Sequence, residues 1–280
     1  MKRQRLGIAL AAVLLAFPGA PAAAQQPAKA PAQQPAKAPA QQPAKAAAQP
    51  PAVAPAPDID PDAVAALDRM GAYLRTVKTF RVKAVTTRDR VLENGQLVQA
   101  DSKVDILARF PDRLRLDTES TRQERMYLYD GKSFTIYGKR IQYYATIPAP
   151  PTIGQLSTML SDKYDISIPL EDLFWWGTEK VNSSAITSAT EIGPADVLGT
   201  TCQQYAFRQE GLDWQIWIQL GENPLPRKLV ITTTTDASRP QYSAVYIWDL
   251  APSYNEAAFV FDPPAGALKI PLATADKAGN

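Results

Sequence analysis

Hydrophobic and polar residues alternate with a period of two over much of the chain. In the stretch "DWQIWIQL", Trp214, Ile216 and Ile218 fall on one face, with polar residues between them. This alternation indicates a β-strand that has one face turned away from water. Trp217 breaks the pattern because it falls on the polar face. We expect its ring either to pack beneath a helical segment or to form part of a contact surface.

About ten strands are predicted in this way, and most follow one another through short turns. The Glu-Asn-Gly sequence at 93–95, between two alternating runs, is a strong hairpin signal. In the second strand of that hairpin, Val104, Ile106 and Phe110 are inward residues. The predicted strands lie within residues 80–92, 96–110, 113–120, 125–138 (two strands), 140–148, 186–192, 200–209, 213–220, 227–235 and 242–250.

Two other segments have the spacing of apolar residues that is typical of helices. The first begins with Asp60 and Pro61, which are a preferred N-cap and a preferred first helical residue. Asp58, Asp60 and Asp62 also resemble the start of a calcium loop, but Ala63 stands where that loop requires glycine. We therefore expect Asp60 to cap the helix rather than to bind a metal ion.

The second helical segment begins near Ile153 and forms an insert between two groups of strands. It ends in an aromatic cluster of Phe174, Trp175 and Trp176, which shows no strand alternation. The two tryptophans are predicted to form a lid or the mouth of a groove. Ordinary packing in the core or at an edge is the alternative, because aromatic residues are common in any core.

Together these elements predict an α+β fold. One large curved antiparallel sheet, a half-barrel, is covered by the N-terminal helix and the mid-chain helical insert. A sheet of that width has to be covered, closed or stacked. Two helical segments are few for so much apolar sheet surface, so we expect an apolar cavity that binds a ligand. The residues predicted to line it are Val104, Ile106, Phe110, Phe174, Trp175, Trp176, Trp214, Ile216 and Ile218.

The first 24 residues have the pattern of a secretory signal peptide. A charged start precedes an apolar stretch that is too short to remain as a membrane anchor, and cleavage is predicted after Ala24. The expected organisation is a signal peptide at 1–24, a disordered linker at 25–57, a folded domain at 58–272 and a flexible C-terminus at 273–280. The mature protein is predicted to be soluble and periplasmic.

The predicted linker is rich in proline, alanine, glutamine and lysine. Residues 25–48 are three octads, "QQPAKAPA" twice and then "QQPAKAAA". Such a segment has no apolar face to bury and is expected to remain extended. The simplest interpretation is a solvated spacer. The alternative is a tether whose Lys29, Lys37 and Lys45 make a peripheral contact with lipid phosphates or the cell wall.

The folded part is slightly acidic, although the whole chain has a formal charge of +2. From Asp58 onward the chain has 24 basic and 28 acidic residues, a balance of −4. A nucleic-acid-binding domain would carry its positive charge on the folded part. No nucleic-acid partner is therefore predicted.

The chain contains no histidine and a single cysteine, Cys202. Histidine-dependent catalysis and histidine-ligated zinc are thereby excluded, and no nucleotide-binding loop or nucleophile elbow is present. The adjacent acids Glu171 and Asp172 are predicted to be solvated loop charges, since no partner for acid–base catalysis is evident. Cys202 is predicted to be a small buried strand residue, with an intermolecular disulfide as the alternative. No catalytic residue, metal or cofactor is predicted.

Four stretches carry a resemblance to a known arrangement. They are "PLEDLFWWG" at 169–177, the run from "CQQYAFRQEG" to "PLPRKLVI" at 202–231, "RPQYSA" at 239–244 and "FVFDPPAGALKI" at 259–270. Over residues 59–272 the chain resembles the LolA/LolB-like lipoprotein-carrier fold, and within it a family of predicted periplasmic proteins, domain of unknown function family 2092 (DUF2092).

The resemblance implies a half-barrel whose concave face is apolar and is covered by helices. Relatives with this fold hold acyl chains of lipids or lipoproteins in the periplasm. The face that bears Trp214, Ile216 and Ile218 would then line a groove for a guest molecule. Acceptor lipoproteins of this fold are anchored by lipid. A lipid anchor would require a cysteine directly after the cleavage site. The single cysteine of this chain is Cys202, so no such anchor is expected.

Three classes of function follow. The leading hypothesis is a non-enzymatic periplasmic carrier that shields a lipid, a lipoprotein acyl chain or another amphiphile between sheet and helices. The second is an interaction or sensory module with a filled core that binds a protein partner through its surface. The third, a hydrolase without histidine, has no supporting motif. A continuous cavity would favour the first hypothesis, and a filled core with an exposed aromatic patch would favour the second.

Overall fold

The computed structural model describes residues 58–181 and 183–275. The predicted signal peptide (1–24), the predicted linker (25–57) and residues 276–280 of the predicted flexible C-terminus lie outside the described residues. The cleavage site after Ala24 and the lysine contacts of the linker therefore remain predictions.

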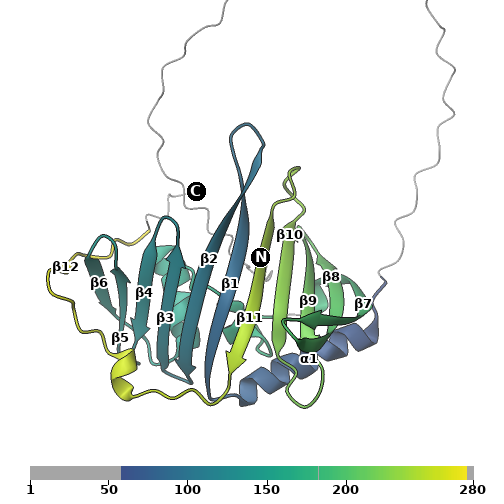
Figure 1. Ribbon diagram of the computed structural model, residues 1–280, viewed down its shortest axis with the longest axis horizontal. Coiled ribbons are helices and arrows are strands. Elements are labelled where there is room, and N and C mark those ends of the chain that lie inside the picture. Colours follow the sequence, from purple (N-terminus) through teal and green to yellow (C-terminus); the bar gives the residue numbers. More distant parts are fainter. Residues whose placement is uncertain (1–57, 182, 276–280) are drawn as a thin grey trace, which may run out of the picture. The chain divides into compact units, whose positions relative to one another are not determined.

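The described residues contain one twelve-stranded sheet (Figure 1). Its order is β12-β6-β5-β4-β3-β2-β1-β11-β10-β9-β8-β7, and every pair is antiparallel except β12 with β6. The predicted α+β class and the large curved antiparallel sheet are confirmed. The strands are β1 (Thr79–Val91), β2 (Leu97–Arg109), β3 (Arg113–Ser120), β4 (Glu124–Tyr129), β5 (Ser133–Gly138), β6 (Tyr143–Pro148), β7 (Ile186–Val197), β8 (Thr200–Gln209), β9 (Leu212–Gln219), β10 (Pro226–Thr233), β11 (Gln241–Asp249) and β12 (Leu268–Lys269).

The hairpin of β1 and β2 forms where the sequence predicted it. Val91 pairs with Leu97, and the turn between them contains Gly95 at a φ of 80°. Glycine adopts this backbone conformation without the steric cost that a Cβ atom would bring. The end of this long hairpin extends beyond the neighbouring strands (Figure 1).

Helices cover one face of the sheet, which we call the inner face. They are α1 (Pro61–Thr76), α2 (Ile153–Tyr164) and the short α3 (Asp172–Trp175). The Asp60 side chain accepts a hydrogen bond of 2.9 Å from the Asp62 N–H, so the predicted N-cap is confirmed. α1 lies at the β7 end of the sheet (Figure 1), where the Asp60 N–H donates to the Ala189 carbonyl oxygen at 3.0 Å.

The C-terminal segment follows the opposite, outer face of the sheet. After β11 the chain forms the 3₁₀-helix η2 (Glu256–Phe259), and the Phe261 ring then packs against Tyr137 and Tyr144, with centroids 5.6 and 4.9 Å apart. The chain next adds β12 to the sheet edge. The Ala275 N–H finally donates to the Lys163 carbonyl oxygen of α2 at 3.0 Å. This segment therefore connects the outer face with the helical layer.

One continuous hydrophobic core lies between the inner face and the helices. Every second residue along the central strands contributes to it, as the alternation predicts. From the sheet come Phe80, Val82, Val104, Ile106, Leu114, Leu116, Tyr129, Phe134, Phe207, Trp214, Ile216, Ile218, Leu229 and Tyr246, and from the helical side Ala63, Met70, Leu74, Leu156, Leu160, Leu170, Leu173, Phe174 and Trp176.

Trp217 packs on the outer face in a second, smaller cluster. Its neighbours there are Val197 and Cys202, and the ammonium group of Lys228 lies 4.6 Å from its ring centroid. Neither predicted position of Trp217, beneath the helical insert or exposed as a contact, is correct, because the side chain is only 9% exposed. Cys202 is buried and free, so its prediction as a small buried strand residue is confirmed.

The strand predicted within residues 140–148 begins later in the structure than the sequence pattern indicates. β6 begins at Tyr143, and Ile141 lies in the preceding turn with 67% of its surface exposed. Gln142 in that turn has a φ of 56°, which interrupts the extended backbone. The alternation of apolar residues therefore begins one apolar residue, Ile141, before the strand itself.

Candidate functional site

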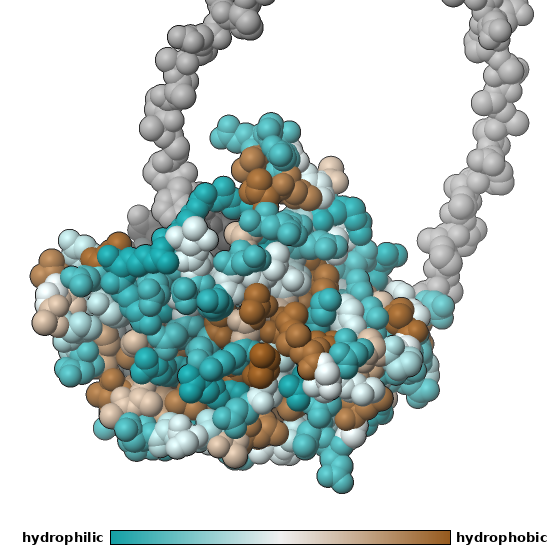
Figure 2. Space-filling view, in the orientation of Figure 1, coloured by the Kyte–Doolittle hydropathy of each residue, from teal (hydrophilic) through white to brown (hydrophobic). Residues whose placement is uncertain are grey.

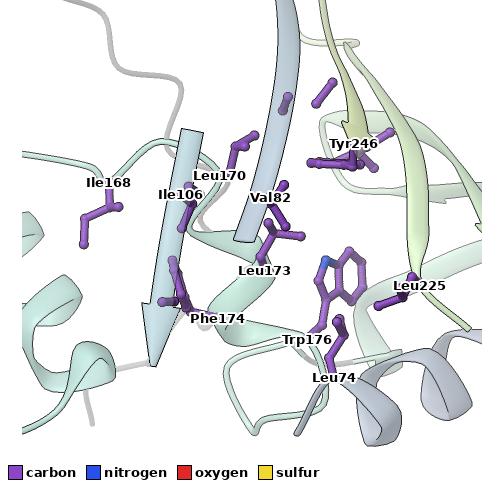
Figure 3. Close-up of a cluster of buried hydrophobic side chains, with 14 of the residues drawn as sticks. Leu74, Val82, Ile106, Ile168, Leu170, Leu173, Phe174, Trp176, Leu225 and Tyr246 are labelled. Atoms are coloured by element: carbon purple, nitrogen blue, oxygen red, sulfur yellow. The ribbon is translucent and has the colours of Figure 1, made fainter. Parts of the chain in front are cut away.

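A loop with little regular structure covers the centre of the inner face. This insert segment, residues 166–177, follows α2 and contains only the four-residue helix α3. Its residues Leu170, Leu173, Phe174 and Trp176 are buried. Figure 3 shows these side chains among Val82, Ile106 and Tyr246 of the sheet and Leu74 of α1.

Arg75, in the last turn of α1, holds the end of α3. Its two terminal nitrogens donate to the carbonyl oxygens of Leu173 and Phe174, each at 2.9 Å. The guanidinium carbon also lies 5.5 Å from the centre of the Phe110 ring. Burial lowers the pKa of Arg75, and its Nε is buried without a hydrogen-bond partner. Partial desolvation of the Arg75 charge is therefore an energetic cost that accompanies the two hydrogen bonds to the insert segment.

Two glycines make the second contact between α1 and the insert segment. A Cβ atom on Gly71 would lie 2.6 Å from the backbone nitrogen of Gly177, and one on Gly177 would lie 2.4 Å from the carbonyl oxygen of Gly71. Gly177 also has a φ of 73°. Only glycine at both positions allows the backbones to approach this closely.

A pocket of about 310 Å³ lies where α1, the end of the insert segment and the sheet meet. Most of its lining is apolar, which suits an apolar or aromatic group. The rings of Trp176 and Trp214 both line it, with centroids 5.8 Å apart. The other lining residues are Leu67, Asp68, Ala72, Gly177, Thr178, Val181, Ser183 and Ile186.

The structure brings most of the predicted ligand-binding residues together. Trp176 and Trp214 line the pocket, and the rings of Phe110 and Phe174 meet edge to face at 5.9 Å. The remaining inward residues are buried beneath the helices and the insert segment, in the floor of the core: Val104, Ile106, Ile216 and Ile218. In this arrangement their side chains contact protein atoms rather than line an open groove.

Trp175 lies apart from the other predicted residues. It is partly exposed, beside Gly154 of α2. The Lys180 ammonium lies 3.6 Å from its ring centroid and also donates to the Thr158 hydroxyl. Adjacent residues at the end of a short helix point in different directions, so only Trp176 of the pair reaches the pocket.

Asp172 is an acid within the apolar layer. Its Oδ2 atom is buried and has no hydrogen-bond partner. Burial is the main cause that raises its pKa to about 6, and the charge of Glu171 adds to the effect. The Asp172 charge in turn raises the pKa of both Tyr242 and Tyr246 on β11, where burial is the larger cause. The Tyr246 hydroxyl is likewise buried without a partner.

The expectation that Glu171 and Asp172 are solvated loop charges is wrong for Asp172. α3 turns this side chain toward the sheet. Glu171 accepts a hydrogen bond of 2.9 Å from the Ser157 hydroxyl of α2, and burial raises its pKa while this bond and Lys180 lower it. Burial of these side chains depends on how the insert folds back on the sheet, which local sequence does not specify.

Arg75, Gly71 and Asp68 also belong to the site, and sequence reasoning did not identify them. All three lie on α1, where a helical wheel places Gly71 beside the buried residues. The signal that could have identified Gly71 is a glycine inside a helix, which costs stability unless close packing requires it. No comparable signal identified Arg75, because its partners are backbone carbonyl groups about 100 residues away.

Among the helices of residues 58–181 and 183–275, none combines the length and the apolar character that a membrane span requires. The same residues contain no cluster of three or more acidic or cysteine side chains suited to hold a metal ion.

A family model described as "Predicted periplasmic protein (DUF2092)" matches residues 63–273. No curated protein matches the chain.

Several solved structures are similar in outline. An uncharacterized conserved protein from Thermus thermophilus is 11% identical and aligns over 75% of this chain and 99% of its own, with a TM-score of 0.43. LprF from Mycobacterium bovis is 13% identical, with coverage of 70% and 97% and a TM-score of 0.43. A LolA superfamily protein from Nitrosomonas europaea is 9% identical, with coverage of 71% and 97% and a TM-score of 0.35.

Proposed function

We propose that this chain, which belongs to the DUF2092 family of predicted periplasmic proteins, binds an amphiphile between the inner face of its sheet and its helices. The ligand would be a lipid, the acyl chain of a lipoprotein or another hydrophobic molecule, held without covalent bonds and without catalysis. The observation that carries the proposal is the largely apolar pocket between Trp176 and Trp214. It adjoins the buried residues that the sequence predicted to contact a ligand.

The pocket is too small for tight binding by itself. Its volume of about 310 Å³ is at the low end of ligand-binding pockets. Micromolar affinity corresponds to about 8 kcal/mol, or roughly ten buried CH₂ groups at about 0.8 kcal/mol each. Burial must also offset about 4 kcal/mol or more for the freedom lost on association, which requires more CH₂ groups than this pocket holds. We therefore propose that the insert segment moves aside and that the acyl chain takes the place of its buried side chains.

Several features of the insert segment support this movement. It has one short helix, and Leu170 within it has a φ of 58°, a costly conformation for a residue other than glycine. Asp172 places an unpartnered carboxylate oxygen in the core, which disfavours the closed arrangement. Against these costs stand the two hydrogen bonds from Arg75 and the contact between Gly71 and Gly177. Leu170, Leu173, Phe174 and Trp176 are also buried in the closed arrangement, and the acyl chain would replace them in the core.

The alternative function is an interaction or sensory module with a filled core. One observation favours it: Val104, Ile106, Ile216 and Ile218 are buried against protein atoms in this structure. The outer face also exposes Val85 and Ile247, at 55% and 56%, and Figure 2 shows apolar residues gathered over the middle of that face. This face would then contact the partner.

Binding of a neutral apolar fluorescent probe, N-phenyl-1-naphthylamine, separates the two functions. A carrier should enhance the probe's emission in a saturable way. Ala72→Trp should weaken binding, because Ala72 lines the pocket yet is exposed, so the larger side chain can be accepted without disturbing the core. Thr76→Trp on the same helix is the matched control, since Thr76 does not line the pocket.

Lipids should also be extracted from wild-type protein purified without detergent and identified by mass spectrometry. Co-purified amphiphile that Ala72→Trp reduces would support the carrier. If the wild type binds no probe and carries no lipid, the interaction module takes its place. If Ala72→Trp and Thr76→Trp bind the probe equally tightly, the binding site does not lie in this pocket.

A further inference from the structure

The pocket has one charged side chain. Among its described lining residues, only Asp68 carries a charge, and the others are apolar, aromatic, glycine or hydroxyl residues. Asp68 is exposed on α1, and its side chain makes no hydrogen bond or ion pair within the described part of the chain. A free carboxylate therefore stands at the edge of an apolar pocket.

Two other tryptophans already have a cation from the chain itself. Lys180 lies 3.6 Å from the ring centroid of Trp175, and Lys228 lies 4.6 Å from that of Trp217. No described lysine or arginine lies over Trp176 or Trp214. The aromatic pair that lines the pocket thus lacks the cation that these other tryptophans have.

We propose that this pocket binds an alkylated ammonium group, the head group of a cationic or zwitterionic amphiphile. Asp68 would be its counter-ion, and the rings of Trp176 and Trp214 would contact its methyl groups. This inference rests on the proposed function, because it names the chemistry of the ligand for the same pocket.

The chemistry of the lining supports this class of ligand. Quaternary ammonium groups bind in aromatic cages, since the face of a tryptophan ring attracts a cation whose methyl groups also bury apolar surface. A sulfate, phosphate or carboxylate would meet the Asp68 carboxylate without a cation in the lining to offset the repulsion. The volume of about 310 Å³ suits one small head group and the first part of its chain.

Three detergents with the same dodecyl chain test the inference by isothermal titration calorimetry, each below its critical micelle concentration. They are dodecyltrimethylammonium, dodecyl sulfate and dodecyl maltoside. We expect the wild-type protein to bind the ammonium compound at least about tenfold more tightly than the sulfate. Asp68→Asn should remove most of that preference and leave affinity for the uncharged maltoside unchanged.

The folded part of the chain has a net charge of −4 from Asp58 onward, so general attraction of cations needs a control. Asp162→Asn removes another exposed acid, on α2, that does not line the pocket. It should retain the wild-type preference.

Each outcome decides between the two proposals. If all three compounds bind equally, the head-group inference is wrong while the amphiphile carrier stands. If none binds, both are wrong. The inference is also wrong if Asp68→Asn retains the preference, or if Asp162→Asn loses it to the same extent, because attraction to the acidic surface would then explain the binding.

Discussion

Replacement of Asp172 by asparagine should stabilise the closed arrangement at neutral pH. The pKa of Asp172 is raised from 3.8 to about 6, mainly by burial, and the Oδ2 atom has no partner. A difference of about two pH units corresponds to about 3 kcal/mol that the ionised carboxylate costs the folded state. Asparagine has nearly the same shape and no charge, so most of this cost should disappear.

The sign of the pH dependence follows from the raised pKa. Between about pH 4 and pH 6 the folded protein binds this proton more tightly than the unfolded chain, so wild-type stability falls as pH rises through this range. Above about pH 7 the Asp172 carboxyl group is ionised in both the folded and the unfolded state, so its ionisation lowers stability no further. The other groups near Asp172 are Glu171, Tyr242, Tyr246 and, beside Tyr242, Arg88. Glu171 also has a raised pKa and contributes in the same direction.

Urea unfolding of wild type and Asp172→Asn at about pH 4 and about pH 7.5 measures the effect. The variant should be up to about 3 kcal/mol more stable at the higher pH and similar to the wild type at the lower pH. Asp162→Asn, an exposed replacement on α2, should show no such dependence. A stability difference that is the same at both pH values would refute the argument, because the cost would then not come from ionisation.

Three further changes test the contacts that hold the insert segment and the packing of the inner face. Gly71→Ala should destabilise the domain by about 1 to 3 kcal/mol in urea unfolding, since its Cβ would lie 2.6 Å from the Gly177 nitrogen. Gly154→Ala, whose Cβ would meet only Trp175 at an ordinary 3.4 Å, should be neutral or stabilising. Arg75→Met removes two hydrogen bonds to α3 carbonyl groups, so chymotrypsin should cleave the insert segment faster, and an unchanged rate would show that Arg75 does not hold it. Ile218→Trp should overpack a side chain that is 4% exposed and cost about 1 to 3 kcal/mol; retained stability together with weakened probe binding would instead reveal an open groove beneath it.

Local pattern determined the elements of this protein. Alternation predicted the inward set of β9 correctly because a pleated strand turns successive side chains to opposite faces, whatever covers them. Asp60 predicted the start of α1, and Gly95 the turn of the first hairpin, because each acts through its own backbone and that of its nearest neighbours. Because short turns join successive strands, most strands that are neighbours in the sequence pair with each other as antiparallel hairpins. These features need no knowledge of distant residues.

Tertiary structure decided the environment of the same residues. Asp172 is buried because α3 folds onto β11, and Trp217 is covered because Val197 and Cys202 lie beside it on the outer face. Arg75 acquired its partners only when α1 and the insert segment met, at a crossing that Gly71 and Gly177 permit. Burial, desolvation and contact depend on which distant segments come together. The sequence by itself therefore determined the strands, the helices and their inward residues, while only the folded structure decided how much of the inner face is filled and where a pocket remains.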